Sequence, residues 1–163
     1  MLLLLLLGTT DILKSSLIIF VVGGPGCGKE TQCKNMATKY GFCHVGLGQL
    51  LRQEAQKSTH RGRQIRDMML QGLLVPSVGR APDIVIAFDC SMQTMVQRVL
   101  HRGQVERRAE DCEVVMFRHL ATYYTLCEPV LTFYQQKKLL RNISAEEAPE
   151  NIFAKCCSVI ESL

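Results

Sequence analysis

The sequence has 163 residues, of which 47% are hydrophobic and 21% charged, and this composition is typical of a soluble protein with one globular domain. Its net charge of +4 suits small anionic ligands but is too weak to indicate nucleic-acid binding. No aromatic residues stand between the basic ones as a platform for stacking bases, which also argues against a nucleic-acid partner.

The chain opens with one methionine and six leucines, Met1–Leu7. This run lacks the basic region and the small-residue cleavage site of a signal peptide. It is far shorter than a membrane span, and the charged residues Asp11 and Lys14 come soon after it. We expect residues 1–16 to be a disordered leader, residues 17–163 to form a single domain, and no membrane partner. A targeting role for the leader is the alternative.

An apolar, β-branched segment, Leu17–Val22, predicts a strand buried on both faces. The residues GGPGCGKETQ (23–32) come next and lead into a predicted helix, Lys29–Tyr40, which ends at Gly41. The pattern G-x-x-x-x-G-K needs glycines because backbone N–H groups turn inward around phosphate oxygens and leave no room for Cβ atoms. The helix points its positive end at the same place. This order of elements predicts a phosphate-binding loop; a tight turn without a ligand is the alternative.

Strands and helices alternate along the rest of the chain. The predicted strands are Phe42–Val45, Asp83–Asp89 and Leu139–Ile143. The predicted helices are Leu50–Lys57, Gly62–Gln71, one capped by Ser91 and stopped by Gly103, one that runs to Lys137 with a break at Pro129, and one that starts at Pro149. The alternation predicts an α/β three-layer sandwich, a parallel sheet with helices on both faces. Ligands of such sheets bind beyond the carboxyl ends of the strands.

The eight cysteines stand at positions 27, 33, 43, 90, 112, 127, 156 and 157. They include no C-x-x-C pair and no zinc-like arrangement with histidine. Reduced thiols are the simplest interpretation, and they favour a cytoplasmic location.

The segment IIFVVGGPGCGKETQ resembles the first strand and phosphate loop of the adenylate kinases, especially the short cytosolic type, in which the loop reads G-G-P-G-x-G-K-G-T-Q. The resemblance continues through KYGFCHVGLGQLLR, LLVP, VIAFDCSMQTMVQRVLHRG, YY, EPVLTFY and NISAEEAPENIF. It implies the fold of the P-loop nucleoside triphosphate hydrolases in a monomer. It also implies ATP on the loop, AMP under a helical flap, Mg²⁺ with the ATP, and direct phosphoryl transfer that interconverts ATP, AMP and ADP.

The resemblance also implies the site residues. The ATP-binding set is Gly24, Pro25, Gly26, Cys27, Gly28, Lys29, Glu30, Thr31 and Arg102. Lys29, Arg102 and Arg108 match the groups that neutralise charge on the transferred phosphoryl group. The AMP side matches Arg52, Val75 and Arg108, and the metal side matches Thr31 and Asp89. Guanidinium groups suit phosphate because their planar fork donates two parallel hydrogen bonds.

The sequence departs from the family pattern at functional positions. Glu30 replaces the glycine after the lysine, Leu47 replaces a hydroxyl residue of the AMP pocket, and His119 replaces a phosphate-binding arginine. After Ser77 the family continues through a helix and a central strand that ends in D-G-[FY]-P-R, which this sequence lacks. Such a segment amounts to roughly 30 residues or more. Without that strand, we expect Phe42–Val45 to pair directly with the first strand, or the first strand to become an edge.

The lost motif supplies an aspartate for magnesium and an arginine for AMP, so three hypotheses remain. They are a working ATP:AMP phosphotransferase, an ATP-binding member with little or no turnover, and a shortened chain that folds poorly. A carboxylate at Glu30, about 6 Å from a phosphate, opposes it by roughly 3 kcal/mol, unless it pairs with Lys34. We expect weak ATP binding that Glu30→Gly tightens about tenfold without restoring transfer.

Overall fold

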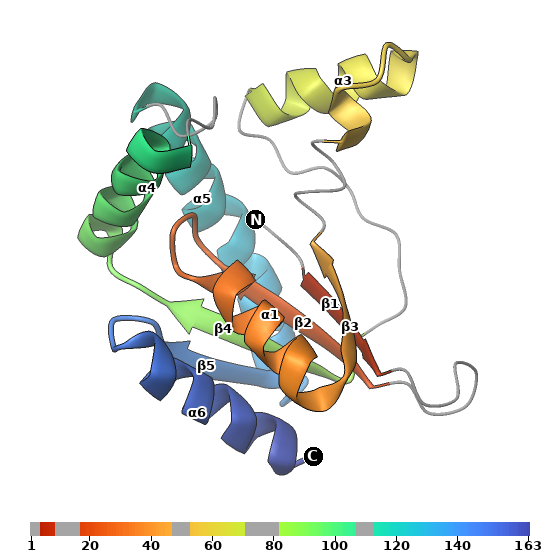
Figure 1. The fold of residues 1–163 in the computed structure, drawn as a ribbon, viewed down its shortest axis with the longest axis vertical. Coiled ribbons are helices and arrows are strands. Elements are labelled where there is room, and N and C mark those ends of the chain that lie inside the picture. The colour runs from red at the N-terminus through yellow and green to blue at the C-terminus, as the bar shows by residue number, and fades with distance from the viewer. Residues whose placement is uncertain (1–3, 9–16, 47–52, 71–81, 107–112) are drawn as a thin grey trace.

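The computed structural model describes residues 4–8, 17–46, 53–70, 82–106 and 113–163 (Figure 1). The strands are β1 (Leu4–Gly8), β2 (Ile18–Gly23), β3 (Phe42–Gly46), β4 (Ile84–Asp89) and β5 (Leu140–Ser144). The helices are α1 (Lys29–Tyr40), α3 (His60–Leu70), α4 (Met92–Glu106), α5 (Glu113–Gln136) and α6 (Pro149–Glu161). Within these ranges, none of the helices has the length and apolar character needed to cross a membrane.

The strands form one five-stranded sheet in the order β3-β1-β2-β4-β5. β2, β4 and β5 are adjacent and parallel, with Val21 opposite Ile86 and Ala87 opposite Asn142. The prediction that these three segments form a parallel sheet is therefore confirmed. Their shared direction brings the ends of β2 and β4, and the loop after β2, to one edge of the sheet.

β1 corrects two expectations from the sequence. It lies between β2 and β3 and is antiparallel to both, with Leu6 opposite Ile19 on one side and His44 on the other. Residues 4–8 are therefore part of the sheet rather than of a disordered leader. Phe42–Val45 neither pairs with the first long strand nor leaves it as an edge, and the sheet is mixed. The physical reason is that two neighbouring edges carry N–H and C=O groups that must be paired, and a strand of either direction can pair them.

Helices cover both faces of the sheet, as predicted (Figure 1). Alternate residues of β2 point to opposite faces. Ile19 and Val21 are fully buried in a cluster that includes Met36 of α1 and Cys156 of α6. Ile18, Phe20 and Val22 face the other way and pack against Leu131 and Tyr134 of α5. Burial of each such side chain contributes roughly 1.5–3 kcal/mol, so β2 is anchored from both sides.

α5 continues through Pro129, where the sequence predicted a break. A proline inside a helix lacks an N–H group, so the carbonyl four residues earlier, at Thr125, loses its helical donor. Both Pro129 and Thr125 are exposed. Solvent exposure of this turn lowers the free-energy penalty of keeping the helix intact, because water can take the place of the missing donor.

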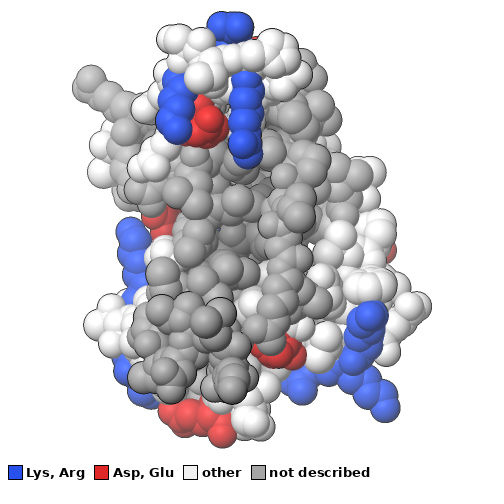
Figure 2. Space-filling model, turned by 90° about the vertical axis from the view of Figure 1, so that its right-hand side faces the viewer, with Lys and Arg blue, Asp and Glu red and all other residues white. Residues whose placement is uncertain are grey.

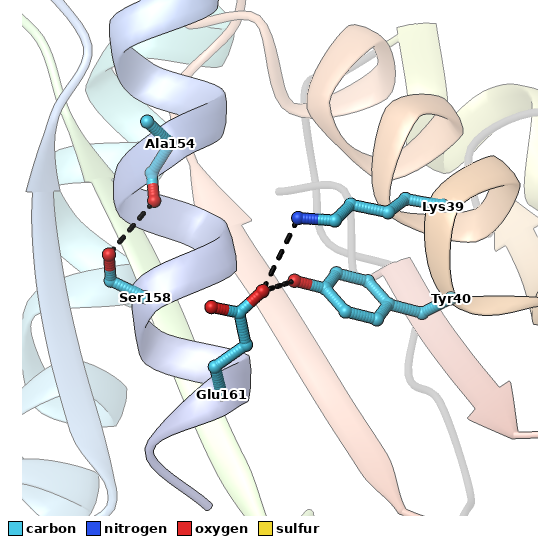
Figure 3. A network of polar contacts seen from close by, with 5 residues as sticks. All are labelled: Lys39, Tyr40, Ala154, Ser158 and Glu161. Carbon is cyan, nitrogen blue, oxygen red and sulfur yellow. Dashed lines mark hydrogen bonds and ion pairs between the residues drawn. The ribbon is translucent and has the colours of Figure 1, made fainter.

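A polar network joins the last turn of α1 to the last turn of α6 (Figure 3). Lys39 Nζ and the Tyr40 hydroxyl both donate to Glu161 Oε1, at 3.3 and 2.7 Å. These hydrogen bonds lower the pKa of the Glu161 carboxyl, the one from Tyr40 contributing most. Burial, more than the neighbouring groups, raises the pKa of Tyr40 to about 12. The network fixes the closing helix beside α1 over one face of the sheet.

A second carboxylate holds the start of α4 against the end of β5. Ser91 caps α4 as predicted, because its Oγ accepts from the Thr94 N–H at 3.2 Å. Glu146 accepts hydrogen bonds from the Ser91 backbone N–H and, at 2.7 Å, from the Thr94 hydroxyl. These bonds lower the pKa of Glu146 from 4.5 to about 2, with the Ser91 N–H as the largest cause.

The lowered pKa of Glu146 gives stability a defined pH dependence. A carboxylate whose pKa is lower in the folded state stabilises the fold above the unfolded value of 4.5, and this contribution disappears as the pH falls towards 2. We expect Glu146→Gln to lower the melting temperature at pH 7 and to match the unmodified protein near pH 2. Thermal unfolding across this range measures the difference.

Glu128→Gln is the matched control, because Glu128 is an exposed carboxylate on α5. Its unfolding curves should match those of the unmodified protein at every pH. A constant difference between Glu146→Gln and the unmodified protein down to pH 2 would contradict the assigned role of the carboxylate.

Candidate functional site

The loop between β2 and α1 has the shape of a cradle at the carboxyl edge of the sheet. Gly26 and Gly28 have φ angles of 73° and 85°, in the left-handed region that favours glycine. The Cys27 N–H donates to the Gly24 carbonyl at 3.4 Å, and the Gln32 N–H donates to the Gly28 carbonyl at 3.1 Å as α1 begins. The first N–H groups of a helix have no acceptors within the helix, so this edge is suited to an anion.

Packing from α4 and α5 explains why two of the loop residues are glycines. A Cβ atom at Gly26 would lie 2.9 Å from the Met95 carbonyl oxygen and 2.9 Å from Val99 Cγ2. A Cβ atom at Gly24 would lie 2.3 Å from Met95 Sδ and 3.4 Å from the ring of Tyr123. The helices therefore press directly on the outside of the loop and hold its shape.

Lys29 lies inside this loop with 7% of its surface exposed. Its Nζ donates to the carbonyls of Gly23 and Gly24, both at 2.7 Å, and lies 3.6 Å from Cys27 Sγ. A buried ammonium group needs such partners, because an unpaired buried charge is strongly unfavourable. The side chain can exchange these carbonyls for the oxygens of an anion without leaving the loop.

Glu30 lies in the first turn of α1 and forms an ion pair with Lys34 of the same helix. Its Oε1 lies 3.4 Å from Lys34 Nζ, and the two side chains are 37% and 66% exposed. The spacing i, i+4 with the acidic residue first is the favourable orientation for such a pair. Of the two arrangements that the sequence left open, the structure has the ion pair with Lys34.

Other predicted site residues lie near the same edge. Asp89 ends β4 with an exposed side chain, and its carbonyl accepts from the Ala145 N–H at 2.7 Å. Thr31 is exposed in the first turn of α1, and Arg102 is half-buried on α4. Among the residues with a described position, no three or more His, Cys, Asp or Glu side chains gather to hold a metal.

Arg98 lies within the segment VIAFDCSMQTMVQRVLHRG, but the sequence assigned it no role, and it links the loop to two strand ends. Its guanidinium donates to the Ala145 carbonyl at 2.9 Å and to the Gly26 carbonyl at 3.5 Å, and lies 3.9 Å from Cys90 Sγ. Its place in that segment, one turn before Arg102 on α4, was the signal that could have found it. Arg98 ties the cradle to the residues just after β4 and β5.

Three of the remaining predicted residues have no described position. Arg52, Val75 and Arg108 lie outside the described residues. His119 is half-buried on α5, and the neighbouring Arg118 is exposed. Figure 2 shows lysine and arginine side chains at the end of the molecule where α3 lies, and Arg61 and Arg63 of this helix are exposed. Positive charge therefore also occurs away from the loop.

Comparison with known proteins identifies relatives of the whole chain. The sequence model of a family described as adenylate kinase matches residues 21–79. The chain is 32% identical to human adenylate kinase isoenzyme 1, and the match covers 93% of this chain and 97% of that relative. It is 36% identical to mouse adenylate kinase isoenzyme 5, over 96% of this chain but only 34% of that longer relative.

The lengths of these alignments reveal an internal gap. They run over 190 positions for human isoenzyme 1 and 194 for mouse isoenzyme 5, whereas the chain has 163 residues. At least 27 positions (190 − 163) in the first relative and 31 (194 − 163) in the second therefore have no counterpart here. This agrees with the segment that the sequence lacks after Ser77.

The packing around the loop predicts different effects for two similar substitutions. Gly26→Ala and Gly28→Ala both place a Cβ atom at positive φ, but only the one at Gly26 would meet other atoms within 4 Å. We expect Gly28→Ala to lower the free energy of unfolding by about 1 kcal/mol. We expect Gly26→Ala to lower it by about 1–3 kcal/mol more, because α4 must move. Urea unfolding of both variants measures the difference, and equal losses would contradict the described contact with α4.

Proposed function

The chain belongs to the adenylate kinase family, and from this premise we propose that it binds ATP in the loop of residues 24–31 but transfers phosphate to AMP far more slowly than complete members do. The observation that carries the ATP half of the proposal is the loop itself, with Gly26 and Gly28 at positive φ and Lys29 buried inside it. The missing segment supports the second part of the proposal, slow phosphoryl transfer to AMP.

On the ATP side, the phosphates replace the loop carbonyls as partners of Lys29. The N-terminus of α1 adds backbone N–H groups and the positive end of its dipole. When bound with ATP, Mg²⁺ would supply neutralisation of phosphate charge. It prefers oxygen ligands and keeps several waters, so the Thr31 hydroxyl and the Asp89 carboxylate suit its outer contacts at this edge. Arg102 approaches the ATP phosphates from α4.

On the AMP side, we assign Arg52 to the AMP phosphate, Val75 to the adenine and Arg108 to the transferred phosphoryl group. Three changes weaken this side: Leu47 offers no hydroxyl, His119 stands in place of an arginine, and D-G-[FY]-P-R is absent from the sequence. Each lost charge-assisted hydrogen bond is worth roughly 1.5–3 kcal/mol. Two such losses lower AMP affinity by several powers of ten, and the missing aspartate also weakens the organisation of Mg²⁺.

A non-catalytic ATP-binding protein is the second candidate, and the absence of D-G-[FY]-P-R favours it. It shares the ATP loop with the first candidate and differs only in whether any transfer remains. For both candidates we propose a single domain that binds ATP and adenine mono- or diphosphates as a monomer in the cytoplasm.

A coupled assay of ADP formation from ATP, AMP and Mg²⁺, combined with calorimetric ATP titration, tests the proposal. We expect measurable ATP binding, no saturation by AMP at millimolar concentration, and a rate well below that of human isoenzyme 1. Lys29→Met should abolish ATP binding, because it removes the cation inside the loop. A rate equal to that of isoenzyme 1 would contradict the role given to the missing segment, and absence of ATP binding would contradict the role of the loop.

The Glu30–Lys34 pair predicts how the carboxylate affects ATP. Because Glu30 turns to an exposed lysine, its repulsion of the phosphates is screened. We expect Glu30→Gln to tighten ATP binding by less than tenfold, or less than about 1.4 kcal/mol. Lys34→Gln removes this ion pair, and removing the charge of Glu30 in that background should tighten binding by more than in the unmodified protein.

ATP titrations of the unmodified protein, both single variants and the double variant measure the effect of Glu30→Gln on ATP affinity with and without Lys34. Equal effects of Glu30→Gln in both backgrounds would show that Lys34 does not orient the carboxylate. Restored phosphoryl transfer in Glu30→Gln would show that Glu30, rather than the missing segment, limits the reaction.

A further inference from the structure

β1 occupies a central place in the sheet, between β2 and β3. β3 pairs only with β1 among the described residues, and β2 pairs with β1 on one edge and β4 on the other. Because β1 is antiparallel to both neighbours, β2 and β3 run in the same direction, separated by one strand (Figure 1). β3 is therefore held in the sheet through β1.

We propose that residues 4–8 act as a donor strand, supplied by the same chain, which replaces a central strand within the segment that this chain lacks. The relatives carry at least 27 positions without a counterpart here, which is enough for a strand and its connections. The donor strand connects β3 with the half of the sheet that carries the loop of residues 24–31. The proposal does not depend on whether the chain transfers phosphate.

The physical chemistry of residues 4–8 suits this role. A strand in the middle of a sheet that is covered on both faces is apolar throughout, and four leucines before a glycine meet this requirement. The segment contains no charge and no proline, so every residue can take part in the backbone ladder. Without it, β2 and β3 would each present an unpaired edge to the other.

Pairing with β3 offers a direct test, because Leu7 lies opposite the native Cys43. Opposite residues of an antiparallel pair have Cα atoms about 4.5–5.5 Å apart, within the range that a disulfide spans. We expect Leu7→Cys to form a disulfide with Cys43 within one chain under mild oxidation, as identified by peptide mass mapping. The other cysteines with a described environment are buried, which limits competing pairs.

Two variants serve as controls. Leu6→Cys lies opposite His44, and successive residues of a strand face opposite sides of the sheet, so it should form no disulfide with Cys43. Leu7→Cys combined with Cys43→Ser should form none either. A 7–43 disulfide between two chains would overturn donation by the same chain, and absence of any 7–43 disulfide would overturn the pairing.

A second experiment tests whether the strand supports the fold. Leu6→Pro removes an N–H group from a strand that is paired on both edges, and we expect its melting temperature to fall by about 10 °C or more. Leu6→Val keeps an apolar residue that favours strands, and we expect a change within about 3 °C. Equal melting temperatures for the two variants would overturn the proposal. If Leu6→Pro does not fold, the disulfide experiment in the folded protein still decides it.

Discussion

The structure depends on the pairing of both edges of β2. This strand carries the glycine-rich loop of residues 24–31 at its carboxyl end, and its side chains are buried on both faces of the sheet. Its N–H and C=O groups therefore cannot turn to water and need neighbours on each side. β4 supplies one neighbour, as expected of a parallel α/β sheet, and β1 supplies the other from the opposite direction. The position of the loop relative to β3 results from this second pairing.

The loop itself is shaped by contacts outside its own motif. Met95 and Val99 of α4 lie against Gly26, Tyr123 of α5 lies against Gly24, and Arg98 binds a carbonyl of the loop. These helices come from residues far along the chain. A phosphate loop taken alone would be a flexible, glycine-rich turn, and the packed helices convert it into a site of fixed geometry. The same contacts do not involve residues 71–81, where the sequence departs from the family pattern.

Much of this architecture could be predicted from the sequence, because β2, β4 and α1 carry strong periodic and turn signals. β5 and the cap at Ser91 were predicted for the same reason. β1 could not be, because leucine favours helices at least as much as strands and a uniform run specifies neither period nor register. The helix through Pro129 depends on solvent exposure, and the role of Arg98 depends on contacts between distant residues. Neither property can be read from a local pattern. The residues assigned to AMP, Arg52, Val75 and Arg108, stay predictions.

In the proposed function, nucleotide binding depends on charges held within the loop and α1, whereas phosphoryl transfer depends on groups from several segments. Lys29 is held by carbonyls of its own loop, and Glu30 is directed to Lys34 on the outer flank of α1. A carboxylate next to a phosphate site is thus tolerated because its charge is paired in solvent, where its field is weak. Phosphoryl transfer, in contrast, requires arginines and a metal-organising carboxylate from several segments to converge at the same time. This sequence lacks the D-G-[FY]-P-R segment, whereas the contacts of α4 and α5 with the loop come from other parts of the chain. In the proposed function, the loop therefore keeps its shape through local contacts that do not depend on the groups needed for phosphoryl transfer.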